Sequence, residues 1–338
     1  MKTLFSYRSL GLAVAALASL LLVALACLTH SVPIDSDTGL QIVLAGLVVN
    51  REALNAMYNG FKAAFNDAFA GVTPMWQKVA TEVPSTAKVE NYGWLGEFPQ
   101  LREWIGDRHV KSIAASGYAI LNKKWESSIG VPRDDIEDDA YGVFSKLFAQ
   151  MGYAAATHPD QLVFPMLSAG FTTNCFDGQY FFDTDHPVGA GVVSNSGGGA
   201  GSAWYLLDTS RPLKPLIFQK RRDYALTSMV DMKDEGVWMR DEYRYGVDAR
   251  ANVGYGFWQM AYGSKQTLDA TSFNAAIAAM MAFASDEGRP LGISPSLLVV
   301  APSNRAAAKA LIEAETLASG ASNTNFRAVE LYVCPWLT

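Results

Sequence analysis

Apolar residues recur at helical spacing in the segment 50–69. Asn50 can cap a helix, and Glu52 stands in its first turn, where a negative charge suits the helix dipole. One apolar stripe follows, formed by Leu54, Met57, Tyr58, Phe61, Phe65 and Phe69. Gly71 and Pro74 end the pattern. It predicts a helix whose stripe packs on the core of its own domain or, as the alternative, on a neighbouring molecule.

A second, longer helix is predicted after Pro132. Its first turns are acidic, as suits a helix N-terminus, with Asp134, Asp135, Glu137, Asp138 and Asp139. Its expected apolar face is made of Ile136, Phe144, Leu147, Phe148, Met151 and Ala155. The pair His158–Pro159 predicts a break or kink, and Pro165 makes any continuation beyond it irregular. A metal site is the alternative explanation of the acidic run.

Strand patterns and further helices make up the rest of the chain. Residues 79–128 are strand-like but interrupted, which suggests a long two-stranded excursion. Such a ribbon is marginal in water and needs support from elsewhere. Loops dominate 171–215, strands are expected at 246–263, 297–301 and 327–333, and helices at 272–283 and 304–317. These elements predict a mixed α+β fold without internal repeats.

The segment 91–109 combines features that normally exclude each other. It is rich in aromatic residues, with Tyr92, Trp94, Phe98 and Trp104. Glycines, Pro99 and several charges interrupt it, as on a surface. Both properties agree if another protein molecule covers that surface, because Trp, Tyr and Arg anchor interfaces. The alternative is a loop folded back over its own domain.

Composition narrows the possible classes of protein. The chain has 338 residues, of which half are apolar and 18% charged, so it can bury a sizeable core. A net charge of −6 gives no support for a dedicated nucleic-acid reader. Cys27, Cys175 and Cys334 are odd in number and far apart, which argues against a disulfide framework or a zinc site. The usual nucleotide-binding and hydrolase signatures are missing from the sequence.

The N-terminus carries a hydrophobic leader, residues 1–47. Between Leu10 and Leu28 it has no charge and is long enough to cross a bilayer. Lys2 and Arg8 precede this stretch, and Ala24-Leu25-Ala26 near its end is a possible A-x-A cleavage site, as in a secretory signal. An exported or membrane-anchored protein is therefore one functional alternative. A start codon assigned too early, with the body beginning near Val48, is another explanation.

The strongest candidate for catalysis is the segment 174–188. It places Cys175, Asp177, Asp183, Asp185 and His186 close together in sequence. A Cys/His hydrolase or a metal site would use such residues. The spacing matches no ligand pattern, however, and ordinary turns bounding a Phe181/Phe182 hairpin explain it better. We therefore assign no catalytic, cofactor-binding or metal-binding residue from the sequence, and expect no cofactor.

Two smaller features remain. Lys220, Arg221 and Arg222 form the only basic cluster of the sequence. Such a cluster is usually a solvated face, and the alternative is a contact with acidic groups of a partner or with a phosphate. The run SNSGGGAGS at 194–202 predicts a flexible loop tip rather than a domain linker, because patterned sequence resumes at once.

Long stretches of the chain resemble the major head subunit of Mu-like phages and prophages, the gpT family. The strings include VPSTAKVENYGWLGEFPQLREWIGDR (83–108), WESSIGVPRDDIEDDAYGVF (125–144), HPDQLVF (158–164), FDGQYFFDTDHPV (176–188), WYLLDTSRPLKPLIFQKRR (204–222), YGVDARANVGYGFWQMAYGS (245–264), DEGRPLGISPSLLVVAPS (286–303) and ELYVCPWLT (330–338). The resemblance begins near Val48. It implies a structural protein and no enzyme.

The resemblance implies the major capsid fold shared by tailed phages, herpesviruses and encapsulins. It predicts an N-terminal arm at 48–82 and an extended loop at 83–130. A peripheral domain with a spine helix would take 131–170 and 325–338, and an axial domain 171–324. The family usually lacks a leader, so we expect residues 1–47 to lie outside the mature fold.

The resemblance also implies a function and partners. Copies of the subunit would form the hexamers and pentamers of an icosahedral shell, assembled in the host bacterial cytoplasm and kept in the virion. Expected partners are a scaffold or protease, the portal and head-completion proteins. Contact with packaged double-stranded DNA would be non-specific, and the mature form would have no membrane.

Overall fold

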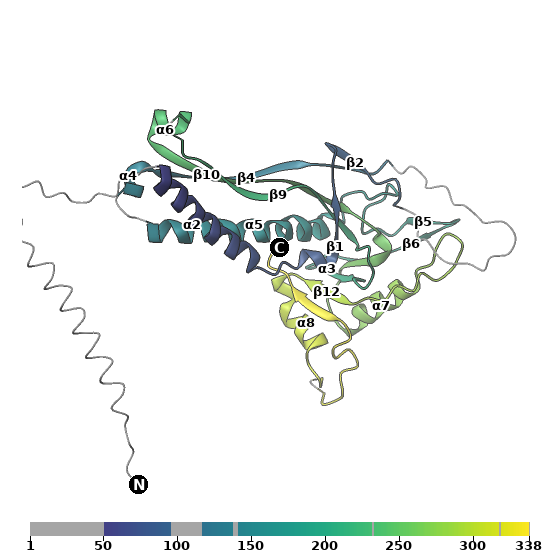
Figure 1. Ribbon diagram of the computed structural model, residues 1–338. Coiled ribbons are helices and arrows are strands. Elements are labelled where there is room, and N and C mark those ends of the chain that lie inside the picture. Colours follow the sequence, from purple (N-terminus) through teal and green to yellow (C-terminus); the bar gives the residue numbers. More distant parts are fainter. Residues whose placement is uncertain (1–50, 96–116, 138–140, 232, 318, 338) are drawn as a thin grey trace, which may run out of the picture. The chain divides into compact units, whose positions relative to one another are not determined.

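Two sheets and the helices beside them organise the computed structural model (Figure 1). The structure describes residues 51–95, 117–137, 141–231, 233–317 and 319–337. Several expected features lie outside these ranges: the leader with the stretch from Leu10 to Leu28, the cap Asn50, Phe98, Pro99 and Trp104 of the aromatic segment, and Asp138 and Asp139 of the acidic run. Among the described residues, none of the helices combines the length and the apolar character needed to cross a membrane. The mixture of helices and strands confirms the α+β prediction.

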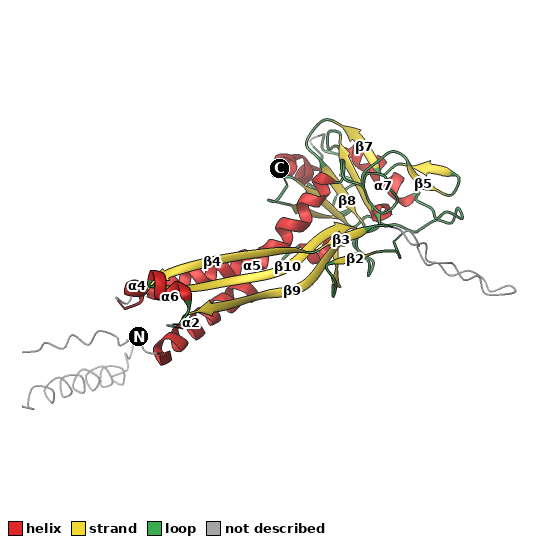
Figure 2. Ribbon diagram, turned by 90° about the horizontal axis from the view of Figure 1, so that it is seen from above, coloured by secondary structure: helices red, strands yellow, loops and turns green. Residues whose placement is uncertain are grey.

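The larger sheet has four strands in the order β1-β9-β10-β4. Strand β1 (Ala80–Pro84) runs parallel to β9 (Leu216–Met229), whereas β10 (Glu242–Tyr255) is antiparallel to both β9 and β4 (Lys123–Pro132). The β9–β10 hairpin extends along the helices and carries the short helix α6 (Glu235–Arg240) at its tip (Figure 2). The expected extended loop and axial domain therefore both contribute strands to one sheet.

Helices α2 (Arg51–Ala70) and α5 (Tyr141–Ala169) pack on each other and on one face of this sheet. Period-two alternation along β10 turns Tyr243, Tyr245 and Val247 toward them. Their buried partners include Leu54, Phe61 and Phe65 of α2 and Phe148 and Met151 of α5. The predicted helix at 50–69 and its core-facing stripe are confirmed.

Helix α5 corrects two expectations. It runs through Pro159 and Pro165 without a break, whereas we expected a break or a kink at His158–Pro159. Each proline removes one backbone donor, and the complete burial of Val163, Phe164 and Leu167 holds the helix in place. Leu147, expected in the apolar face, is 42% exposed. The apolar pattern of the first turns is wider than the surface available to cover it.

The smaller sheet has five strands in the order β13-β12-β8-β11-β7. Their bounds are β7 (Ser196–Gly199), β8 (Trp204–Leu207), β11 (Ala261–Lys265), β12 (Leu297–Val300) and β13 (Glu330–Val333). The closing strand β13 pairs in parallel with β12. We expected it in the peripheral domain, apart from residues 171–324; instead it completes the sheet of β12, because Leu331 and Val333 pack on that core.

Two helices accompany the smaller sheet. Helix α7 (Ala270–Met281) begins at a capping box between Asp269 and Ser272. Helix α8 (Arg305–Ile312) follows the single turn η2 (Pro302–Asn304) and ends earlier than predicted. The side-chain amide of Asn323 donates to the carbonyls of Leu311 and Ala314, both at 2.8 Å, so it satisfies carbonyls that a longer helix would have bonded.

Short elements complete the chain. Strands β2 (Val89–Asn91) and β3 (Ala119–Leu121) pair antiparallel at the base of the expected excursion. Helices α3 (Trp76–Val79) and α4 (Arg133–Glu137), the turn η1 (Trp258–Met260) and the hairpin of β5 (His186–Val188) with β6 (Gly191–Val193) are the others. The predicted hairpin around Phe181 and Phe182 is displaced, because the bridge lies at Asn174 and Tyr180 and both Phe rings enter the core.

Candidate functional site

A buried polar cluster joins three of the five residues singled out as candidates for catalysis. The Cys175 thiol donates to Asp177 Oδ1 at 3.0 Å, and His186 Nδ1 lies 2.6 Å from Asp177 Oδ2. His186 is completely buried, and its ring stacks on Trp258 with centroids 4.0 Å apart. Asp177 therefore lies between the thiol and the imidazole as their shared acceptor.

Asp183 and Asp185 do not join this cluster. The Asp183 carboxylate accepts from the backbone N–H groups of Tyr180 and Thr184. Asp185 provides only its backbone carbonyl, to Gln179. Both residues thus belong to ordinary turn structure, Asp183 through its carboxylate and Asp185 through its backbone, as the sequence indicated.

Asn195 is the residue that sequence reasoning missed. Its Nδ2 group donates to the carbonyls of Phe181 (2.8 Å), Ala261 (3.2 Å) and Trp258 (3.3 Å). Its Oδ1 accepts from the N–H of Asp183 at 2.9 Å and lies 3.2 Å from His186 Nε2. Asn195 stands at the start of the run 194–202, which the sequence predicted to be a flexible loop tip, so no sequence signal marked it as buried. One fully buried amide thus ties the loop 174–195 to η1 and β11.

The electrostatics of the cluster oppose nucleophilic chemistry. Burial, followed by the hydrogen bond to Asp177, raises the pKa of the Cys175 thiol far above its usual range. Burial alone would raise the pKa of Asp177, but its hydrogen bonds with His186 and Cys175 outweigh that effect and lower it. A thiol acts as nucleophile or metal ligand only as thiolate. The three possible ligand atoms lie within 4.8 Å of one another, yet each already has a partner.

The basic cluster is largely neutralised by the chain itself. Lys220 Nζ lies 2.7 Å from Glu82 on β1 and 3.4 Å from Asp223. Arg222 pairs with Asp248 across the β9–β10 ladder. These contacts support the solvated-face interpretation rather than a phosphate site.

The first part of the aromatic segment packs on its own chain. Tyr92 is buried, and its hydroxyl donates to Gln219 Oε1 on β9 at 2.8 Å. Trp94 is half-buried, with its ring 6.1 Å from Tyr92 and 6.0 Å from Phe257. For these residues the folded-back loop is the better description, so Trp94 is a weaker candidate for an interface anchor than the sequence indicated.

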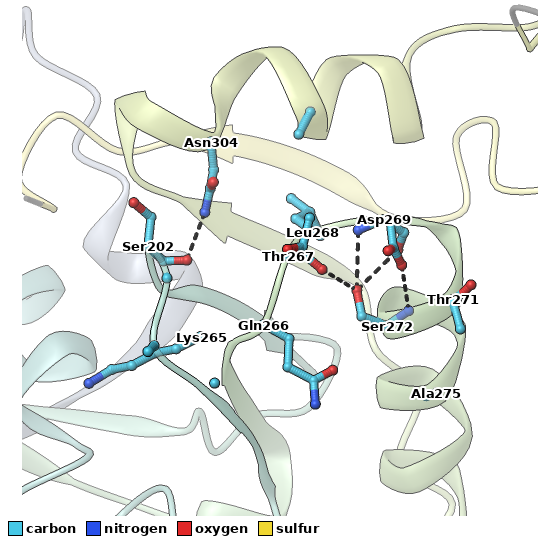
Figure 3. Close-up of a pocket in the computed structure, with 14 residues that line it drawn as sticks. Ser202, Lys265, Gln266, Thr267, Leu268, Asp269, Thr271, Ser272, Ala275 and Asn304 are labelled. Carbon is cyan, nitrogen blue, oxygen red and sulfur yellow. Dashed lines mark hydrogen bonds between the residues drawn. The ribbon is translucent and has the colours of Figure 1, made fainter.

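Several hollows open on the surface of the described residues. The first, of about 710 Å³, lies between the glycine-rich loop 199–202, the start of α7 and Asn304, which donates to the Ser202 carbonyl at 3.0 Å (Figure 3). Asp269 and Ser272 face it but are engaged in the helix cap. The second, of about 330 Å³, lies between α5 and the sheet. There His158 Nδ1 lies 2.5 Å from the Tyr224 hydroxyl, and burial lowers the pKa of His158.

Helices packed along a long hairpin, with a second sheet beside them, are the architecture of a tailed-phage capsid subunit. The fold matches the subunit in the procapsid of bacteriophage JBD30 with a TM-score of 0.78 and 49% identity, over 86% of this chain and all of that one. The match to the subunit in the JBD30 capsid has a TM-score of 0.69 and 35% identity, over the same shares.

Residues 54–337 match the family model of the Mu-like prophage major head subunit gpT, and the chain belongs to this family. It is 47% identical over 279 residues to the Mu-like prophage FluMu major head subunit of Haemophilus influenzae, covering 79% of this chain and 91% of the relative. It is 38% identical over 285 residues to the major capsid protein of Escherichia phage Mu, covering 81% and 93%.

Family membership confirms the resemblance found in the sequence. The chain is a major capsid protein, a structural component of the virion head. This identification replaces two alternative interpretations of the body of the chain. One was a Cys/His hydrolase centred on Cys175 and His186, and the other was an exported or membrane-anchored protein.

Proposed function

We propose that copies of this chain close into an icosahedral shell of hexamers and pentamers around a phage genome. The observation that carries the proposal is the match to the JBD30 procapsid subunit, which covers that subunit completely at 49% identity. Identical subunits can occupy both kinds of ring through small changes at heterologous contacts.

Burial of apolar surface between neighbours would supply the driving force. At about 25 cal/mol per Å², a few thousand Å² shared among several neighbours gives a large gross stabilisation. Ordering costs reduce each single contact to a modest net strength. Because each contact is weak, a wrongly placed subunit can dissociate during assembly. The completed shell is nevertheless stable, because every subunit is held by several neighbours at once.

We propose that the excursion 83–130 reaches a neighbouring subunit with its part between β2 and β3, whereas its end lies in β4 of the long sheet. Its base, β2 with β3, pairs only three residues of each strand, and a ribbon of this kind needs outside support. Tyr92 and Trp94 fix the base to the parent subunit, which leaves the segment beyond them for the neighbour. In this division 48–82 forms the arm, α5 with the long sheet forms the peripheral part, and the sheet containing β12 and β13 forms the axial part.

The proposed partners follow from the same role. A scaffold or protease, the portal and head-completion proteins would meet the shell during assembly in the host cytoplasm, and the mature form would carry no membrane. The JBD30 capsid is decorated with minor capsid protein trimers, and we include decoration by a minor capsid protein among the expected contacts. Packaged DNA would contact the shell non-specifically, consistent with the net charge of −6.

We propose a purely structural role for Cys175, Asp177 and His186, with no catalytic, cofactor-binding or metal-binding residue in the chain. Each of these groups already has a hydrogen-bond partner within a buried site. Calorimetric titration with Zn²⁺ tests this proposal, and the expected result is no binding. Hydrolytic activity that Cys175→Ala abolishes would contradict it.

Assembly is tested by expressing the full chain and, in parallel, the chain from Val48. Electron microscopy and sedimentation should reveal closed shells, with or without co-expressed scaffold. Monodisperse monomers under every scaffold and salt condition would refute the proposal. Mass spectrometry of purified particles would detect residues 1–47, and an intact Met1 would contradict our expectation for the leader.

A further inference from the structure

The two places where the chain leaves and re-enters the long sheet are joined by one polar junction. The chain leaves the sheet after β1, through a turn at 85–88 that leads into β2, and it returns from β3 to β4 through the single residue Asn122. Strands β2 and β3 lie at the end of the long sheet that is remote from α4 and α6 (Figures 1 and 2). We define the junction as Ser85, Glu90 and Asn122.

One carboxylate oxygen of Glu90 shapes the outgoing turn. Its Oε1 accepts from the Thr86 N–H at 2.7 Å, the Ala87 N–H at 2.8 Å and the Ser85 hydroxyl at 2.9 Å. The hydrogen bond from the Ala87 N–H, followed by the other two, lowers the pKa of Glu90. The side chain therefore stays charged at neutral pH, and hydrogen bonds to a charged acceptor are stronger than those between neutral groups.

Asn122 ties the returning crossing to the same turn. Its Nδ2 group donates to Ser85 Oγ at 2.7 Å and to the Ala87 carbonyl at 2.9 Å. Its backbone N–H donates to the Lys88 carbonyl at 3.0 Å. Ser85 Oγ thus accepts from Asn122 and donates to Glu90, so this one atom connects the two crossings.

We propose that Glu90 is a positioning residue that fixes the ribbon of β2 and β3 on the long sheet. Ile120, directly opposite Glu90 in the register, anchors β3 in the core, and Tyr92 anchors the far end of β2. The junction holds the start of β2, so loss of the Glu90 carboxylate would let this strand move relative to the sheet. The inference rests on the proposed function, because the segment beyond the ribbon is the part that would reach a neighbouring subunit.

Replacement of Glu90 should affect the ribbon without unfolding the subunit. Thr86 and Ala87 are exposed, so water can replace the carboxylate as acceptor of their N–H groups. The Ser85 hydroxyl keeps a second acceptor, the Ala87 carbonyl at 3.2 Å. Ser85 and Asn122 themselves are buried, and removing either side chain would leave buried polar groups unsatisfied. Glu90 is therefore the member of the junction whose replacement separates positioning from folding.

Hydrogen exchange of the unassembled full-length subunit, followed by mass spectrometry, tests the positioning. The informative peptide spans 118–125, because it contains β3 and the Asn122 N–H, which donates to the Lys88 carbonyl and not to Glu90. Glu90→Ala should speed exchange in this peptide about tenfold and leave α2 and α5 unchanged. Glu90→Gln keeps one acceptor oxygen and should recover part of the protection. The control Glu82→Gln removes a carboxylate of β1 that pairs with a lysine of β9, and it should leave this peptide unchanged.

Assembly of the same full-length variants tests the consequence. A ribbon that is not held in place has to be ordered at each contact, so Glu90→Ala should lower the shell yield about tenfold. Glu90→Gln should recover part of the yield, and Glu82→Gln should lose none. Wild-type shells test the proposed function first, whereas the exchange measurement tests Glu90 without them. Unchanged exchange in Glu90→Ala, or faster exchange in α2 and α5 as well, would overturn the positioning role. Faster exchange at 118–125 with an undiminished shell yield would overturn its link to assembly.

Discussion

Replacing Asn195 by Ala removes the amide that joins the loop 174–195 to the core. The Asp183 N–H loses its acceptor, the oxygen beside His186 Nε2 is lost, and the carbonyls of Phe181 and Ala261 lose their donor. Each buried polar group left unsatisfied costs about 1–3 kcal/mol. With some relief from structural relaxation, we expect the free energy of unfolding to fall by about 3–5 kcal/mol, a large share of the ~5–15 kcal/mol typical of a folded protein.

Urea unfolding of the purified chain, followed by the fluorescence of the tryptophans, measures this loss. Asn174→Ala is the matched control, because Asn174 is exposed and makes one side-chain hydrogen bond, to the Gly178 carbonyl at 2.8 Å. Its cost should stay below about 1 kcal/mol, as for most surface substitutions. An Asn195→Ala variant within about 1 kcal/mol of the wild type would refute the central role given to this amide.

Three further predictions concern other parts of the core. In Gly152→Ala the new Cβ would lie 2.3 Å from the Phe65 carbonyl oxygen. We expect overpacking to lower the free energy of unfolding by about 1–3 kcal/mol, more than the ~1 kcal/mol gained from helix propensity, as measured by thermal unfolding. Gly60→Ala is the control: it has open space around the new Cβ and should raise the unfolding temperature. Burial lowers the pKa of His158, so the unfolded chain binds its proton first, and stability should fall as pH drops below about 6.5. His158→Gln should flatten this part of the urea-midpoint curve, and an unchanged slope would contradict the assignment. Cys175→Ala should lower the free energy of unfolding by no more than about 1.5 kcal/mol, because Asp177 keeps His186 and the Gln179 N–H as hydrogen-bond partners. Electron microscopy should still show shells of this variant. Failure of the variant to fold would contradict the prediction.

Some elements could be predicted because their cause is local. The stripe from Leu54 to Phe69 repeats at the helical period and needs no distant partner to define a helix. Four consecutive apolar residues made β12 recognisable as a buried strand. The long family strings identified the class of protein before any geometry was known.

Other features depended on contacts between segments far apart in sequence. The apolar pattern of α5 shows which residues are hydrophobic, but only the positions of α2 and β10 decide that Phe148 is covered and Leu147 is not. The same reason explains β13, whose alternation predicted a strand without indicating β12 as its partner.

The sequence by itself determined the α+β class, the helices α2, α5 and α7, the strands β12 and β13, and membership of the capsid family. These follow from local periodicity and from long specific strings. Only the tertiary structure decided how the candidate site works. It brought Cys175, Asp177 and His186 together with Asn195. Hydrogen bonds and burial depend on which segments meet in space, and the local sequence pattern does not show which distant segments will be in contact.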